Sequence, residues 1–540
     1  MVTGLTLQDN SNTESQSALG HYYDTHRMWL LSITLQGFSM ISLHSKTSFY
    51  TFIKGTFLAS SIILISACND SDNQSKNPPI PDVKKTEIGI WNAPAYGWVF
   101  DIQESGYSLY QTTSQYCSKF ELDKWVSYDA LINSINLSDD KDSFMTTLGG
   151  IKAPGIKVTR EASLPHNCVD NLVKQQGDAD YVFNPEQDFE IFWQNFKEYY
   201  AFFNIENINW DETYQTYAIQ VSATTSQEAL FEIFSEMVAP LKDFHVQINN
   251  EAINESFSVS RKLEVGDIIL AEYLKINGLD DINTQEQLLA FHAYYVQQIE
   301  ISMGIIGYYL VPDEDVKSNE TETLTWSKTP DNFGYLNVDS MELDALIEQG
   351  ENQAEKLVIL DQQLAMVFSD LNDTQGLMID VRSNGGGNDF VSHKIMSYLI
   401  DNKMHAYSKQ VRLGDARTTL QKVEINPQGK TSYLKPIALL TSADTSSAAE
   451  AFSIAMRARD NTILIGQSTG GGLSDILFKS LPHGLQYGIS NEIYISHDGL
   501  EFEGEGVPVN IAQPFFTLEQ RQEHKDLIIE AAIEWLQSQH

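Results

Sequence analysis

Cysteine and basic residues are scarce in this sequence, and each scarcity excludes a class of protein. Three Cys residues among 540 are too few for a disulfide scaffold or a four-cysteine zinc site. Lys and Arg total 35 against 73 Asp and Glu, which gives a formal net charge of −38. Because nucleic acid and anionic lipid surfaces would repel such a polyanion, neither is an expected partner through charge. No repeat of about 20–50 residues is visible, which excludes repeat architectures.

Apolar and aromatic residues, by contrast, are plentiful. Hydrophobic residues make up 42% of the chain, with 26 Phe and 24 Tyr, and this composition excludes a disordered chain and allows several cores. At roughly 100–200 residues per domain, a chain of 540 residues is expected to hold about two to four domains.

The first apolar run, residues 56–67 (TFLASSIILISA), is typical of a signal peptide. Its 12 residues are too few to span a bilayer, which needs about 20, and two lysines precede it. The run continues into Cys68 as ISAC, which resembles a bacterial lipobox. That resemblance implies a lipid anchor on the Cys68 thiol and a place in the bacterial cell envelope, on the outer membrane facing the periplasm.

The signal-like run lies late in the chain, and we therefore expect translation to begin at Met40 instead of upstream. Residues 68–85 are polar and contain proline, which is typical of a tether that holds a domain off a membrane. The alternative for residues 56–68 is a short buried helix that ends at a structural cysteine.

The two other cysteines, Cys117 and Cys168, would lie in an oxidising compartment if the chain is exported. An exported protein with one remaining pair of thiols often joins them, so we expect a disulfide here. Two separate buried thiols are the alternative.

Changes in periodicity divide the chain. After the tether, short alternating apolar runs with Gly and Pro between them predict strands, and aromatic residues at helical spacing follow. Further on, apolar strands alternate with helices, which predicts an α/β core sheet. The expected units are 1–67 (upstream extension and lipoprotein signal peptide), 68–85 (tether), 86–185 (small β-rich N-terminal module), 186–256 (helical segment ending in LKDFHV), 257–329 (connecting segment) and 330–540 (α/β core).

Within the core and the connecting segment, individual elements can be placed. Capping boxes, in which a Thr and a Gln three residues later satisfy the first helical amides, open two of the helices, at Thr284 and Thr517. The expected strands of the core are 333–338, 376–382, 437–442, 462–467 and 487–496, and the expected helices are 284–306, 350–371, 389–401, 447–459 and 517–538.

Three segments carry residues suited to catalysis. In DVRSNGGG (380–387) a buried strand leads into a glycine turn, where backbone N–H groups can converge on an anion. A phosphate loop would need Gly-Lys-Ser/Thr after the turn, and because that sequence does not follow, a phosphate loop is excluded. In TSADTSSAAE (441–450) a serine stands at a helix start, where N–H groups are unpaired. An ordinary Ser N-cap is the alternative there. The third segment, LKDFHV (241–246), holds a lone His, a residue that is most often structural.

Together these segments resemble the tail-specific, or C-terminal processing, protease family. The forms typical of that family are D-x-R-x-N-x-G-G, S-A-(S/A)-E, G-x-x-T-x-G and L-x-D-x-H, and DVRSNGGG, SSAAE, GQSTGG and LKDFH are similar to them. The resemblance spans roughly residues 186–256 and 330–515, and leaves the N-terminal module outside. It implies a serine-type peptidase with an α/β (α+β) core like the tail-specific protease and crotonase-like folds, acting on a peptide or protein substrate. No metal or organic cofactor is implied.

The family has two styles of active site, and this sequence resembles the style that uses Ser, His and Glu. The Ser–Lys style has its lysine in a T-F-G-K-G turn, but the turn here is TGGGL and Gly472 stands in the lysine's place. The other style is that of the tricorn protease core and of relatives of the retinoid-binding protein of the eye. The resemblance then implies Ser447 as the nucleophile, His245 as its base and Glu503 as the carboxylate that orients the base.

The same resemblance implies that the N–H groups of Gly385, Gly386 and Ala448 bind the oxyanion. Many family members carry a PDZ module after the His segment, but no such pattern is evident in residues 257–328. The expected function is an exported, lipid-anchored serine endopeptidase or C-terminal processing peptidase. The alternatives are a non-catalytic ligand- or peptide-binding lipoprotein on the same fold, and an esterase that uses the same residues.

Overall fold

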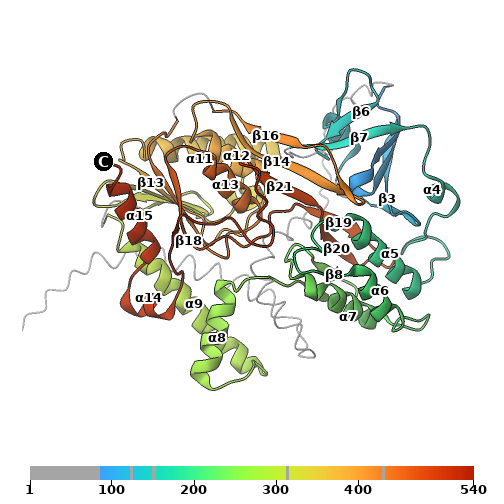
Figure 1. Ribbon diagram of the computed structural model, residues 1–540, viewed down its shortest axis with the longest axis horizontal. Coiled ribbons are helices and arrows are strands. Elements are labelled where there is room, and N and C mark those ends of the chain that lie inside the picture. The colour runs from blue at the N-terminus through green and yellow to red at the C-terminus, as the bar shows by residue number, and fades with distance from the viewer. Residues whose placement is uncertain (1–85, 122–125, 149–153, 312–315, 429–431) are drawn as a thin grey trace, which may run out of the picture.

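The computed structural model describes residues 86–121, 126–148, 154–311, 316–428 and 432–540. Met40, the predicted signal peptide, Cys68 and the tether lie outside the described residues. The described chain forms an N-terminal β-rich module, a helical segment and a mixed α/β core (Figure 1). The predicted fold class is confirmed.

The N-terminal module is built around an antiparallel sheet. Its seven strands lie in the order β4-β3-β2-β1-β7-β6-β5. Trp91 and Phe100 are cross-strand partners, and both are fully buried. The elements are β1 (Gly89–Ala93), η3 (Pro94–Tyr96), β2 (Trp98–Gln103), β3 (Gly106–Thr112), β4 (Cys117–Phe120), α3 (Tyr128–Asn133), β5 (Asn136–Leu137), β6 (Ser143–Thr146), β7 (Ile156–Glu161) and α4 (His166–Asp170).

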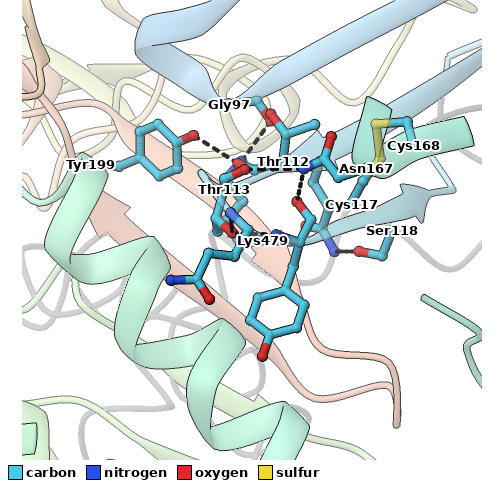
Figure 2. The surroundings of a disulfide bond; sticks show 12 residues. Gly97, Thr112, Thr113, Cys117, Ser118, Asn167, Cys168, Tyr199 and Lys479 are labelled. Carbon is cyan, nitrogen blue, oxygen red and sulfur yellow. Dashed lines mark hydrogen bonds between the residues drawn. A yellow bond between two sulfur atoms is a disulfide. The ribbon is translucent and has the colours of Figure 1, made fainter. Parts of the chain in front are cut away.

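A disulfide between Cys117 and Cys168 joins β4 to α4 (Figure 2). Closing a loop with a sequence separation of 51 residues stabilises the fold by about 4 kcal/mol in the chain-entropy model. Beside it, the buried Lys479 Nζ donates to the carbonyl oxygens of Tyr96 at 2.8 Å and Gly97 at 3.1 Å. These bonds fasten the module to the strand that carries Lys479, β19 (Ile476–Ser480).

The helical segment consists of α5 (Pro185–Tyr199), α6 (Trp210–Ala218) and α7 (Gln227–Val238). Phe192 and Phe196, two of the aromatic residues at helical spacing, are fully buried. Their ring centroids lie 5.0 and 6.0 Å from that of Tyr487. The segment ends in the 3-10 helix η5 (Ala239–Leu241), and β8 (Ile248–Asn250) and β9 (Glu255–Phe257) follow. This packing places the LKDFHV segment against the rest of the molecule.

The core sheet has seven strands in the order β10-β11-β12-β13-β17-β18-β22. Pairing is parallel from β12 to β22. Alternate residues of β13 face opposite layers, since Leu377 and Ile379 pack with helices α11 to α13, whereas Met378 packs with α15. Helices on both faces explain the unbroken apolar strands.

The strands of the core sheet are β10 (Lys317–Ser318), β11 (Leu324–Lys328), β12 (Gly334–Val338), β13 (Leu377–Asp380), β17 (Ile437–Thr441), β18 (Thr462–Gly466) and β22 (Ile511–Ala512). The helices are α10 (Leu343–Leu346), α11 (Gln353–Asp370), α12 (Asp389–Ser397), α13 (Ala448–Arg457), α14 (Leu518–Glu523) and α15 (Leu527–Gln537). The expected helix over 517–538 is thus two helices, because His524 between them has φ 56° and ends the first.

The expected strand over 487–496 is also divided, and neither half joins the core sheet. β20 (Gln486–Ser490) pairs with β19 and β8, whereas β21 (Glu492–Ser496) pairs with β14 (Met404–Leu413). The division falls at buried Asn491, whose side chain donates to the Ala95 carbonyl. Two further short strands, β15 (Ala416–Arg417) and β16 (Gln421–Ile425), extend the β14 sheet.

The connecting segment forms a hairpin of two helices, α8 (Val265–Asn277) and α9 (Gln285–Gly307), which projects from the core in Figure 1. The predicted capping box at Thr284 is present. Within the described residues 257–311 and 316–329 there is no PDZ-like fold. Among the helices that the structure describes, none combines the length and apolarity needed to cross a membrane.

Candidate active site

Ser447, the predicted nucleophile, stands at the start of α13. Its backbone has φ 54° and ψ −123°, a conformation that is strained for a non-glycine residue and is concentrated at functional sites. The Ser447 N–H donates to the Gly472 carbonyl at 3.1 Å and lies 3.2 Å from Glu450 Oε2. These two acceptors hold the strained residue in place.

The glycine turn that follows β13 packs directly against this serine. Gly386 has φ +103°, and a Cβ added to it would lie 2.6 Å from Ser447 Cβ, so only glycine fits. Asn384 links the turn to the end of β12, because its side-chain amide donates to the Val338 carbonyl at 2.8 Å. The Asn384 carbonyl in turn accepts the Ser446 N–H at 3.1 Å. Two motifs that are far apart in the sequence therefore form one site.

Two of the three predicted oxyanion donors have free N–H groups. Across the described ranges of the chain, neither the Gly385 N–H nor the Ala448 N–H donates a hydrogen bond. The prediction for Gly386 is corrected, because its N–H donates to Asn384 Oδ1 at 2.8 Å. Gly386 therefore contributes by its lack of a side chain. The unpaired amides of Gly385 and Ala448 are of the kind that can stabilise an oxyanion.

His245, the predicted base, lies buried in the turn between η5 and β8. Its backbone N–H donates to Asp243 Oδ1 at 3.0 Å, which fixes the turn. Burial lowers the pKa of the imidazole below its ordinary value of 6.5, and nearby carboxylates, Asp243 first among them, oppose this in part. A neutral imidazole at pH 7 is the form that can take a proton.

The turns that carry His245 and Ser447 meet at Gly472. A Cβ added to Gly472 would lie 2.3 Å from Cε1 of Phe244, the neighbour of His245. The carbonyl of the same Gly472 accepts the Ser447 N–H. The Phe244 ring thus occupies the space where a side chain at position 472 would begin. In the part of the chain that the structure describes, no hydrogen bond joins His245 to Ser447, and His245 Nδ1 has no partner.

Glu503, the predicted orienting carboxylate, accepts hydrogen bonds from the backbone that follows Gly472. Its Oε2 accepts the N–H groups of Leu473 and Ser474, both at 2.9 Å. Among the described residues its buried Oε1 has no hydrogen-bond partner. Burial raises the pKa of Glu503 well above its ordinary value, and the carboxylates of Asp243 and Glu450 raise it further.

Glu450 is a site residue to which the sequence analysis assigned no role. It is fully buried in α13, and its carboxylate accepts hydrogen bonds from the Thr469 hydroxyl and from the N–H groups of Gly471 and Gly472, the last two at 2.8 Å. Burial raises its pKa, and these bonds oppose the rise. The signal was present, because Ser447 and Glu450 have the spacing of a capping box.

Arg382 is a second residue whose role the motif alone did not indicate. Its guanidinium binds both oxygens of Asp380, at 2.9 and 2.6 Å, and reaches Asp526 Oδ2 at 2.7 Å. Its carbonyl accepts the hydroxyl of Ser442, in the loop that leads to the nucleophile. Asp380 and Arg382 therefore connect the end of β13 to the start of α15 and to the loop that precedes Ser447.

Comparison with known proteins gives two family matches within this chain. Residues 332–513 match the model of peptidase family S41, and residues 183–239 match the tricorn protease C1 domain. The chain is similar in structure to a protein from Parabacteroides merdae assigned as a peptidase, with 23% identity over 66% of this chain and 97% of that chain and a TM-score of 0.50. It is also similar to the photosystem II D1 C-terminal processing protease, with 12% identity over 62% and 94% of the two chains and a TM-score of 0.37.

The α/β core, together with a strained serine at a helix start, defines this protein as a serine-type peptidase. The matches to peptidase family S41 and to the tricorn protease C1 domain confirm the family resemblance predicted from the motifs.

Proposed function

We propose that this protein is an exported, lipid-anchored serine endopeptidase or C-terminal processing peptidase that hydrolyses peptide bonds through Ser447, with His245 as its general base. The observation that carries the proposal is the Ser447 turn. A strained serine begins a helix there, Gly386 packs against its Cβ, and the adjacent Ala448 N–H is unpaired within the described residues.

The proposed reaction follows from the chemistry of these groups. The Ser447 hydroxyl attacks the carbonyl carbon of the scissile bond while the neutral imidazole of His245 takes its proton. The N–H groups of Gly385 and Ala448 stabilise the tetrahedral oxyanion, and each such donor is worth about 3 kcal/mol of barrier. His245 then returns the proton to the leaving amine, and water repeats the sequence on the acyl-enzyme.

For this reaction His245 must reach Ser447, and the two turns already share Gly472 as a neighbour. We propose that substrate binding tightens the contact, as is common for sites that are loose without substrate. Glu503 acts in two ways in this account. It fixes the backbone at Leu473 and Ser474 through Oε2, and its unpaired Oε1 is an acceptor for the imidazolium that forms.

Turnover of a fluorogenic protein substrate tests the proposal. Residues 86–540 with the disulfide intact should hydrolyse labelled casein, and Ser447→Ala should not. Arg417→Lys serves as a matched control, because Arg417 pairs with Glu501 at the exposed surface. Equal turnover by the Ser447→Ala variant would contradict the peptidase proposal, and saturable peptide binding without turnover by the wild type would favour a binding protein.

The membrane anchor is a separate proposal. We propose that Cys68 carries the lipid and that the tether holds the described domains off the membrane surface in the periplasm. The support is the ISAC sequence after an apolar run of 12 residues, followed by a polar, proline-containing stretch.

A further inference from the structure

Lys262 lies between the helical segment and the hairpin, and its ammonium group enters the active-site region. Its Nζ donates to the carbonyl oxygens of Thr469 and Glu505, the latter at 2.8 Å, and to Ser468 Oγ at 3.1 Å. A Cβ on Gly506 would lie 2.7 Å from this Nζ. The ammonium group therefore joins two turns of the core that are separated in the sequence.

The backbone around Lys262 is anchored to both catalytic turns. On one side the Arg261 guanidinium donates to the Leu241 carbonyl at 2.7 Å, at the start of the LKDFHV segment. On the other side the Val265 N–H donates to Asp444 Oδ1 at 3.1 Å, in the loop before Ser447. The position of the Lys262 side chain is thus fixed relative to the base and the nucleophile.

The turn that receives the ammonium group is the turn that holds Ser447. The Thr469 hydroxyl and the Gly472 N–H both donate to Glu450, and the Gly472 carbonyl accepts the Ser447 N–H at 3.1 Å. Lys262 is bonded to the first residue of this turn through the Thr469 carbonyl. A shift of Thr469 would therefore move the acceptor that keeps Ser447 in its strained conformation.

The partners of Lys262 argue against an ordinary surface ion pair. Its hydrogen-bond acceptors are all neutral oxygens, and the side chain is half-buried. The charged groups that face it are Glu450, Arg261 and Glu505. A cation placed on carbonyl oxygens near a fully buried carboxylate favours the ionised form of that carboxylate.

We propose that Lys262 is a positioning residue of the peptidase site, which holds the Thr469–Gly472 turn in the geometry that fixes Ser447. This inference rests on the proposed function. Lys262 is not assigned as the base, since its Nζ already donates to oxygens of Ser468, Thr469 and Glu505, whereas His245 Nδ1 has no partner among the described residues. It supplies a positive charge to the turn from a segment outside the core.

The test compares the rate at which a fluorophosphonate acylates Ser447 in wild type, Lys262→Met and Lys262→Arg. Lys262→Met should slow acylation and lower kcat between about 10- and 100-fold, because small displacements of a nucleophile have effects of this size, while KM changes little. Lys262→Arg keeps the charge and should recover part of the rate. Lys197→Met is the matched control, since Lys197 pairs with Asp211 at the exposed surface of α5, and it should react at the wild-type rate.

The pH profile gives a readout that a loss of packing alone would not move. The charged groups that face Glu450 are Lys262 and Glu503. Without the ammonium group the pKa of Glu450 rises, so its carboxylate protonates at higher pH and releases the turn. The acid limb of the acylation rate should therefore move to higher pH in Lys262→Met and stay in place in Lys262→Arg.

Circular dichroism and melting temperature establish that each variant is folded. If Lys262→Met does not fold, the neutral Lys262→Gln should show the same shift of the acid limb. A folded neutral variant with the wild-type acylation rate and acid limb would overturn the role of Lys262 while leaving the proposed function intact. A wild-type protein that is not acylated at all would overturn the proposed function, and this inference with it.

Discussion

Individual residues at the nucleophile are held by contacts that leave little freedom. Ser447 adopts a positive φ. Its N–H donates to the Gly472 carbonyl and to the buried Glu450 carboxylate, and the Gly386 backbone packs against its Cβ. Strain of this kind persists only where the surroundings enforce it. Changes to single atoms around Ser447 should therefore affect activity more than overall stability.

The predicted catalytic residues should behave as a unit. Ser447→Ala and His245→Ala should each remove nearly all turnover, and the double variant should be little worse, because such effects are not additive. Glu503→Gln should cost less, since it keeps an acceptor oxygen for Leu473 and Ser474. Steady-state kinetics on the purified variants measure this. Additive losses in the double variant would contradict a shared role.

The pH dependence should follow the buried histidine. Burial lowers the pKa of His245 from 6.5, so the imidazole stays neutral, and able to accept a proton, to lower pH than an exposed histidine would. The acid limb of the wild-type kcat/KM profile should therefore lie below pH 6.5. An acid limb well above that value would indicate a different base.

Gly386→Ala should abolish activity at a modest cost in stability. Its φ of +103° and the 2.6 Å approach to Ser447 Cβ force either a shift of the serine or a shift of the turn. Gly414→Ala is the matched control, because Gly414 has φ +60° and nothing within 4 Å. It should cost about 1 kcal/mol of stability and leave kcat unchanged. Equal activity of the two variants would contradict the direct contact.

At the scale of elements, the segments 241–246, 380–387, 441–450 and 469–475 form the candidate site together, and Gly472 contacts both the His245 turn and the Ser447 turn. The sequence predicted most of these segments, because the glycine turn, the helix-start serine and the lone histidine each have a local pattern. It did not predict the divided strand at Asn491, since a continuous apolar run carries no sign of which neighbour each half will pair with. It also did not indicate Lys262, because an isolated lysine in a loop has no pattern, and only the fold brings it to Thr469.

The contact between Phe244 and Gly472 can be tested with a double-mutant cycle. Gly472→Ala should lower kcat/KM and melting temperature, because the new methyl group would overlap the ring. In a Phe244→Ala background the same change should cost less, with a coupling of about 0.5–3 kcal/mol. Strictly additive effects would show that the ring does not limit the side chain at this position, and that a lysine there could be accommodated.

At the scale of the whole molecule, the N-terminal module and the helical segment are integrated with the core. β20 pairs with β19 on one side and with β8 of the helical segment on the other, while β21 follows β20 in the chain and joins the β14 sheet. Buried Lys479 links β19 to the module, and burial lowers its pKa to about 7. We therefore expect the described units to unfold together.

The anchor prediction also belongs to the whole molecule. Replacing Cys68 with Ser should release the protein from the membrane into the soluble periplasmic fraction, because an unmodified tether has no lipid to insert. Fractionation followed by immunoblotting measures the difference, and Cys117→Ser with Cys168→Ser is the control for loss of a cysteine elsewhere. Identical fractionation of wild type and Cys68→Ser would contradict the lipid anchor.

The measurement that tests the central claim most directly is covalent labelling of the folded protein with a fluorophosphonate, followed by mass spectrometry of its peptides. The account predicts one adduct, located on Ser447, with no adduct in Ser447→Ala. A folded protein that gives no adduct, or an adduct on a different serine, would contradict it.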